Sequence, residues 1–144
     1  MKQFKILEHT ADLKIKVWGK DLPELFKNAA DAMFDAMSGK SEIRNSKHET
    51  NYKFQIKNLK LTAQDHESLL VNFLNELLYL SDVNNQGYRI KDIGFRKNKE
   101  FELKAELIPY PLPPLEIEIK GATYHNLKIE KKTGLYLTII LFDI

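Results

Sequence analysis

The stretch DLKIKVWGKDLPELFKNAADAMFDAM (residues 12–37) joins a strand pattern to a helix pattern and decides the fold class. In its first part, Leu13, Ile15 and Val17 alternate with lysines and a tryptophan, which is the period-two pattern of a half-buried strand. In its second part, apolar residues recur at steps of three and four and so build one apolar face of a helix. Asp21 is placed to cap this helix, and a glycine two residues beyond the stretch is placed to end it.

The rest of the chain follows the same two patterns. A second helix is expected from Asp65, because leucine and phenylalanine recur in adjacent pairs four residues apart before the turn at 84–87. Four prolines between 109 and 114 predict an exposed loop. The remaining expected elements are strands at 4–7, 51–61, 88–95, 101–108, 115–120, 126–131 and 135–142, a polar loop at 40–50, and turns at 97–99 and 133–134. Together they predict one α+β domain over residues 1–144, with two helices packed on a largely antiparallel β-sheet.

The composition is that of an ordinary globular protein. The 144 residues suit one domain, and they are 43% hydrophobic and 29% charged. There is no cysteine, which excludes disulfide scaffolds, thiolate zinc sites and cysteine nucleophiles. The first residues lack the apolar segment of a signal peptide, and no apolar run approaches the ~20 residues needed to span a bilayer. We therefore expect a cytoplasmic protein with no membrane contact.

The charge pattern argues against a strong nucleic-acid surface. The chain has 22 basic and 20 acidic residues, a net charge of +2, and its lysines are scattered and often alternate with apolar residues. Nucleic-acid-binding domains usually gather basic residues into a patch or stripe. A glycine-rich phosphate loop, a GxSxG elbow and an HExxH motif are also absent from the sequence. We expect any contact with RNA to be indirect or weak.

Two aspartates mark the ends of apolar strands. Asp12 directly precedes the alternating strand, and Asp143 ends the most apolar strand, one residue before Ile144 and its terminal carboxylate. If these strand ends meet, three carboxylates converge and their repulsion favours a bound cation. Hard oxygen ligands suit calcium, magnesium or manganese. The residues alone leave a second interpretation open, in which Asp12 caps a turn and Asp143 is merely solvated.

Two histidines and one lysine are weaker candidates. His9 and His125 flank expected strand ends, and an imidazole can bind metal or carry protons near neutral pH. We expect both to be hydrogen-bonded supports beside a site rather than metal ligands or general bases. Lys120 alternates with Ile117 and Ile119, so by its pattern alone it is a solubilising surface lysine.

Four blocks of sequence resemble the archease family. They are EHTAD at 8–12, LNELLYL at 74–80, KGATYHNL at 120–127 and the closing FDI at 142–144. Any one block is weak, but four in the right order over nearly the whole chain are specific. The resemblance implies a protein that assists the GTP-dependent RNA ligase of tRNA splicing. In that role it promotes guanylylation and multiple turnover of the ligase and catalyses no reaction itself.

The resemblance also implies roles for individual residues. It implies a divalent-metal site at Asp12, Asp143 and the terminal carboxylate of Ile144, and a role for Lys120 in activating the partner. Two other functions stay open at this point. One is a metal-dependent phosphohydrolase that would use the two aspartates and a histidine. The other is a chaperone-like adaptor for several nucleic-acid-processing enzymes.

Overall fold

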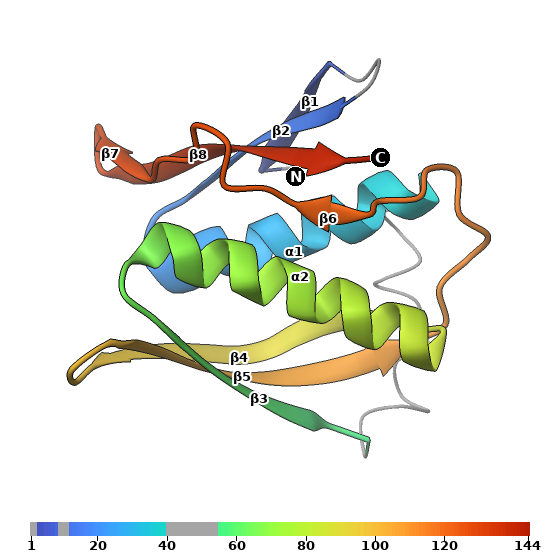
Figure 1. Ribbon diagram of the computed structural model, residues 1–144, viewed down its shortest axis with the longest axis horizontal. Helices are drawn as coiled ribbons and strands as arrows, with labels where there is room; N and C mark the ends of the chain where they lie inside the picture. The colour runs from blue at the N-terminus through green and yellow to red at the C-terminus, as the bar shows by residue number, and fades with distance from the viewer. Residues whose placement is uncertain (1–2, 9–11, 40–54) are drawn as a thin grey trace.

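Two antiparallel sheets lie on opposite sides of a pair of helices (Figure 1). The computed structural model describes residues 3–8, 12–39 and 55–144. One sheet, here called sheet A, has the order β1 (Phe4–Glu8), β2 (Asp12–Gly19), β8 (Leu135–Asp143) and β6 (Gly121–Ala122), and β7 (Glu130–Lys132) also pairs with β8. The other, sheet B, has the order β3 (Lys57–Ala63), β5 (Phe101–Tyr110) and β4 (Gly87–Lys97). The predicted α+β class with two helices is confirmed, and its strands form two sheets instead of one.

The strand and helix that open the fold match the sequence pattern. In β2, Leu13, Ile15 and Val17 are fully buried, whereas the lysines between them are exposed. Helix α1 (Leu22–Ser38) begins after Asp21, whose side chain accepts from the Glu24 backbone N–H at 2.9 Å, while the Glu24 side chain accepts from the Lys20 backbone N–H at 2.9 Å. It ends at a left-handed glycine, as predicted.

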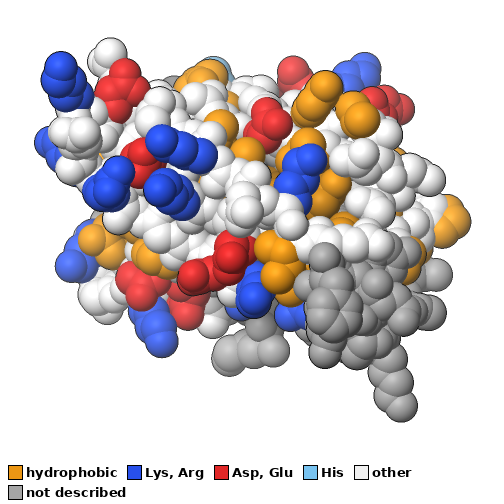
Figure 2. Space-filling view, turned by 90° about the horizontal axis from the view of Figure 1, so that it is seen from below, with side chains coloured by type: hydrophobic (Ala, Val, Ile, Leu, Met, Phe, Trp, Pro, Cys, Tyr) orange, Lys and Arg blue, Asp and Glu red, His pale blue; other side chains and the backbone are white. Residues whose placement is uncertain are grey.

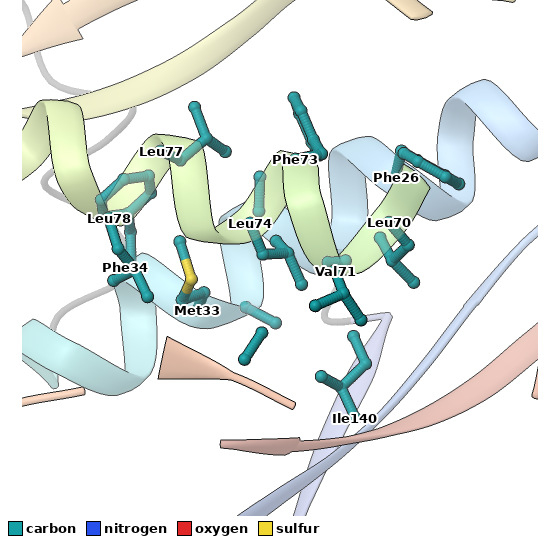
Figure 3. Close-up of a cluster of buried hydrophobic side chains, with 14 of the residues drawn as sticks. Phe26, Met33, Phe34, Leu70, Val71, Phe73, Leu74, Leu77, Leu78 and Ile140 are labelled. Carbon is teal, nitrogen blue, oxygen red and sulfur yellow. The ribbon is translucent and has the colours of Figure 1, made fainter. Parts of the chain in front are cut away.

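Helix α2 (His66–Asn84) fills the space between the two sheets. Asp65 caps it by accepting from the Ser68 backbone N–H at 2.7 Å. Its buried residues occupy most of its circumference, because sheets A and B and α1 cover it from several sides. Figure 3 shows the resulting core, in which side chains of α2 meet Met33 and Phe34 of α1 and Ile140 of β8. Because α2 has apolar residues on several sides, one sheet cannot bury them all, and the second sheet covers the rest.

Most of the remaining strands also lie where they were expected. The strand predicted at 4–7, the hairpin of β4 and β5 and the last strand with its turn at 133–134 are confirmed. The strand predicted at 51–61 begins at Lys57 and ends at Ala63, and residues 51–54 lie outside the described residues. The predicted loop at 40–50 also lies outside them. No helix in the described part of the chain is long and apolar enough to cross a membrane.

Two strand predictions between 115 and 131 are wrong. Residues 115–120 have no strand pairing, because the backbone N–H groups of Glu116 and Ile117 donate to the Met37 carbonyl at the end of α1. Their alternating burial comes from packing: Ile119 is buried in the core and Ile117 packs against it. Of the strand predicted at 126–131, only β7 forms, after a turn in which Asn126 has φ 51°. The two-residue strand β6 was not predicted.

Candidate functional site

The ends of β2 and β8 meet at one edge of sheet A. The two strands pair in register over eight residues, and Asp12 lies directly opposite Asp143. Directly opposed residues of an antiparallel pair have Cβ atoms about 4.5–5.5 Å apart. Both aspartates are exposed, whereas Leu13 and Phe142, the next residues inward, are fully buried. Ile144 follows at once and packs against the core. The fold therefore brings together the two aspartates that the sequence singled out.

The short strand β6 places a third segment beside Asp143. Gly121 pairs with Asp143 on the side opposite to Asp12, and the Lys120 backbone N–H donates to the Asp143 carbonyl at 2.8 Å. The Lys120 side chain is exposed and has no ion pair with any described residue. We call the residues Asp12, Asp143, Ile144 and Lys120 the tip. It carries two side-chain carboxylates, the terminal carboxylate of Ile144 and one ammonium group on three adjacent chain segments.

Asn75 of α2 holds β6 in place. Its side-chain amide accepts from the Ala122 backbone N–H at 2.8 Å and donates to the Ala122 carbonyl at 3.1 Å. The backbone N–H and the carbonyl of Ala122 are thereby both hydrogen-bonded to the Asn75 side chain. Residue-by-residue interpretation of the sequence missed this role. The available signal was weak: Asn75 directly follows Leu74 on the apolar face of the helix, where a buried polar group needs a partner.

The donor set of the tip suits a hard divalent cation. Carboxylate oxygens are the ligands that calcium, magnesium and manganese prefer. Among residues 3–8, 12–39 and 55–144, no group of three or more His, Cys, Asp or Glu side chains could hold a metal ion. The described side chains of the tip therefore supply two carboxylates, and the terminal carboxylate of Ile144 would supply a third. An exposed pair of carboxylates with room for water suits calcium and magnesium alike, since both ions complete their shells with water oxygens.

Of the two predicted supporting histidines, the structure describes only His125. His125 is exposed in the turn after β6, and its ring lies 3.2 Å from the side-chain nitrogen of Asn126. Neither aspartate has a hydrogen bond to it. His9 lies outside the described residues, so its predicted role stays a prediction.

Comparisons with known proteins find similar sequences and similar folds. The family model described as Archease protein family (MTH1598/TM1083) matches residues 4–144. A Methanosarcina barkeri protein named "Protein archease" is 35% identical over 150 residues, covering 99% of this chain and 97% of that protein. The solution structure of Methanobacterium thermoautotrophicum protein 1598 is similar with a TM-score of 0.80, 26% identity and full coverage of both chains. A Thermotoga maritima crystal structure described as "an archease, possible chaperone" has a TM-score of 0.60, 22% identity and coverage of 97% and 96%, which shows the fold alone.

Proposed function

The chain belongs to the archease family, and from that premise we propose that it is a non-enzymatic activator of a GTP-dependent RNA ligase in tRNA splicing. In this role it promotes guanylylation of the ligase and allows the ligase to turn over repeatedly. The observation that carries the proposal is the tip, where Asp12 lies opposite Asp143 in the sheet and the Lys120 backbone N–H donates to the Asp143 carbonyl. It is an exposed group of charges that the fold itself does not use.

A divalent cation at the tip is part of the proposal. Two like charges directly opposite each other on neighbouring strands destabilise a sheet, and a cation between them removes that cost. Asp12, Asp143 and the terminal carboxylate of Ile144 would hold calcium, magnesium or manganese. When bound, the ion supplies positive charge that can meet the phosphate oxygens of the nucleotide in the ligase.

Lys120 provides a second positive group at the same edge. Lysine acts as a compact point charge and binds phosphate or carboxylate without a fixed geometry. The backbone of Lys120 is fixed by its hydrogen bond to Asp143, so the lysine is held beside the carboxylates while its side chain remains exposed. We assign it to contact with the ligase or its nucleotide, which would explain an exposed lysine that no described carboxylate pairs with.

The proposed mechanism is a shift in the population of ligase conformations. The tip docks at the nucleotide pocket and favours the conformation that accepts GTP. A partner that stabilises one conformation by ~3 kcal/mol changes the ratio of the two by a factor of more than a hundred. That is enough to return a stalled ligase to its cycle without any chemistry by the activator.

The proposal is tested by removing the carboxylates. We expect Asp12→Ala and Asp143→Ala to abolish both stimulation of ligase guanylylation and binding of calcium, magnesium or manganese in calorimetric titration. Glu100→Ala removes an exposed carboxylate from the β4–β5 hairpin and serves as the matched control. If both tip variants are folded and support full guanylylation and turnover, the proposal is wrong.

The same purified variants distinguish the proposed function from the two alternatives, a phosphohydrolase and a general adaptor. Turnover of cyclic-phosphate RNA by the protein and a divalent metal alone, lost in Asp12→Ala, would indicate a phosphohydrolase. Stable complexes with several unrelated enzymes, unchanged in Asp12→Ala and Asp143→Ala, would indicate a general adaptor.

Direct RNA binding is not favoured by the outer face of sheet B, where positive and negative side chains are interleaved (Figure 2). There Glu102 pairs with Lys60 at 3.2 Å and with Arg96 at 3.3 Å.

A further inference from the structure

A cleft of about 960 Å³ lies beside the tip, between the C-terminal half of α2 and the chain segment 112–122. Buried residues of three segments, among them Met37, Leu78 and Ile119, line it and form its floor. Lys120 and Gly121 belong to its lining as well as to the neighbourhood of Asp143. The cleft and the tip are therefore continuous.

The walls of the cleft expose large apolar side chains. Tyr79 of α2 is 60% exposed and Leu115 of the opposite wall is 48% exposed. Val83, one turn further along α2 and outside the cleft lining, is also 60% exposed. Large exposed apolar side chains beside a cleft are typical of a place where a partner binds, and a tyrosine is a common anchor of such an interface.

The charges around the cleft favour a cationic occupant. Asp82 and Glu118 line it, both are exposed, and neither side chain has an ion pair or hydrogen bond with another described residue. Helix α2 ends here at Asn84, and its last turn contains no basic residue. The C-terminal end of a helix carries partial negative charge and attracts cations. Among the described residues of the lining, Lys120 is the only basic one, and it lies toward the tip.

From these features we propose that the cleft binds an extended segment of the partner ligase in which a bulky apolar side chain lies next to an arginine or lysine. This inference rests on the proposed function. The apolar side chain would pack between Tyr79 and Leu115, and the basic group would meet Asp82 and Glu118. Phosphate groups of RNA would be repelled by the same carboxylates, so a polypeptide fits the cleft and a nucleic acid does not. A segment held here would keep the adjacent tip on the ligase.

The first experiment measures binding of the full-length cognate ligase by calorimetry. We expect Tyr79→Ala and Leu115→Ser to raise the Kd by about tenfold or more, as for an interface anchor. Asp82→Lys should raise it by a similar factor and also reduce its dependence on salt concentration. Ile139→Ser, at a position that is 43% exposed on β8 and outside the cleft lining, is the control and should change the Kd less than twofold. All four positions are exposed, so circular dichroism should show native folding.

The second experiment identifies the occupant directly. Tyr79 is replaced by the photo-crosslinking amino acid p-benzoylphenylalanine, and the protein is irradiated with the purified ligase and its RNA substrate. We expect a crosslink to a ligase peptide that contains a large apolar residue and a neighbouring arginine or lysine. A crosslink to RNA, to a second copy of this chain, or to a ligase peptide without a basic residue would overturn the inference.

The two proposals fail in different ways. If Asp12→Ala loses stimulation of guanylylation while Tyr79→Ala and Asp82→Lys bind the ligase as the unmodified protein does, the cleft inference is overturned and the proposed function stands. If the unmodified protein neither binds nor stimulates the ligase, the proposed function is overturned, and the cleft inference falls with it.

Discussion

Replacing Asn75 by alanine removes both hydrogen bonds that hold β6 against α2. A buried or half-buried backbone group that loses its partner costs ~1–3 kcal/mol. Because Asn75 is only half-buried, water can reach part of the gap, so we take the lower end for each of the two Ala122 groups and expect a loss of about 2 kcal/mol. For a domain of this size, that corresponds to a fall in Tm of roughly 6–8 °C.

Urea denaturation gives the change in free energy of unfolding, and amide hydrogen exchange shows where the change occurs. In Asn75→Ala the Ala122 amide has no acceptor, so its protection should fall sharply. Asn72→Ala is the matched control on the same helix, because its side chain accepts one exposed hydrogen bond from the Tyr124 hydroxyl at 2.7 Å. It should cost less than about 0.5 kcal/mol. Equal costs in the two variants, with Ala122 still protected, would refute the reasoning.

Three further predictions follow from single positions. Gly19→Ala would place a Cβ 2.6 Å from α1 backbone and should cost about 1–3 kcal/mol in thermal unfolding, whereas Gly94→Ala meets no atom within 4 Å and should be neutral within about 0.5 kcal/mol. Thr138→Val removes a buried hydroxyl without a hydrogen-bond partner and should raise the free energy of unfolding by about 1 kcal/mol; a loss of stability would contradict this. The pKa of Asp65 is lowered, mainly by the hydrogen bond from the Ser68 backbone N–H. Its contribution to the free energy of unfolding is therefore present above the unfolded-state pKa and is lost as pH falls through the folded-state pKa. In a pH series of urea denaturations, Asp65→Ala should cost about 1 kcal/mol near neutral pH and progressively less in acid.

The sequence predicted those parts of the fold whose pattern is set locally. The alternation in β2, the caps at Asp21 and Asp65 and the Thr133–Gly134 turn each depend on residues within a few positions of one another. The segment 115–120 was misassigned because its apolar residues alternate for a different reason. They pack on the core while the backbone bonds to the end of α1. Alternation reports which side chains are buried, and it does not identify the partner of the backbone.

The candidate site was predictable only in its residue types. Asp12 and Asp143 stood out because each is a charge at the end of an apolar strand. Their direct pairing depends on the register between strands more than a hundred residues apart, which no local pattern sets. Asn75 and β6 escaped prediction for the same reason, since the amide finds its partner 47 positions away. The cleft is formed by α2 and a loop without regular structure, so it has no periodic signal at all.

The position of β8 in sheet A has a consequence for how the protein folds. Strand β8 lies in the middle of the sheet and pairs with β2, which lies more than a hundred residues earlier, so sheet A closes only after β8 has been synthesised. Pairings of such long sequence separation form late and slowly. Until then β2 has an open edge that can pair with other chains. Because the two aspartates meet only through this pairing, a nascent or misfolded chain lacks the tip.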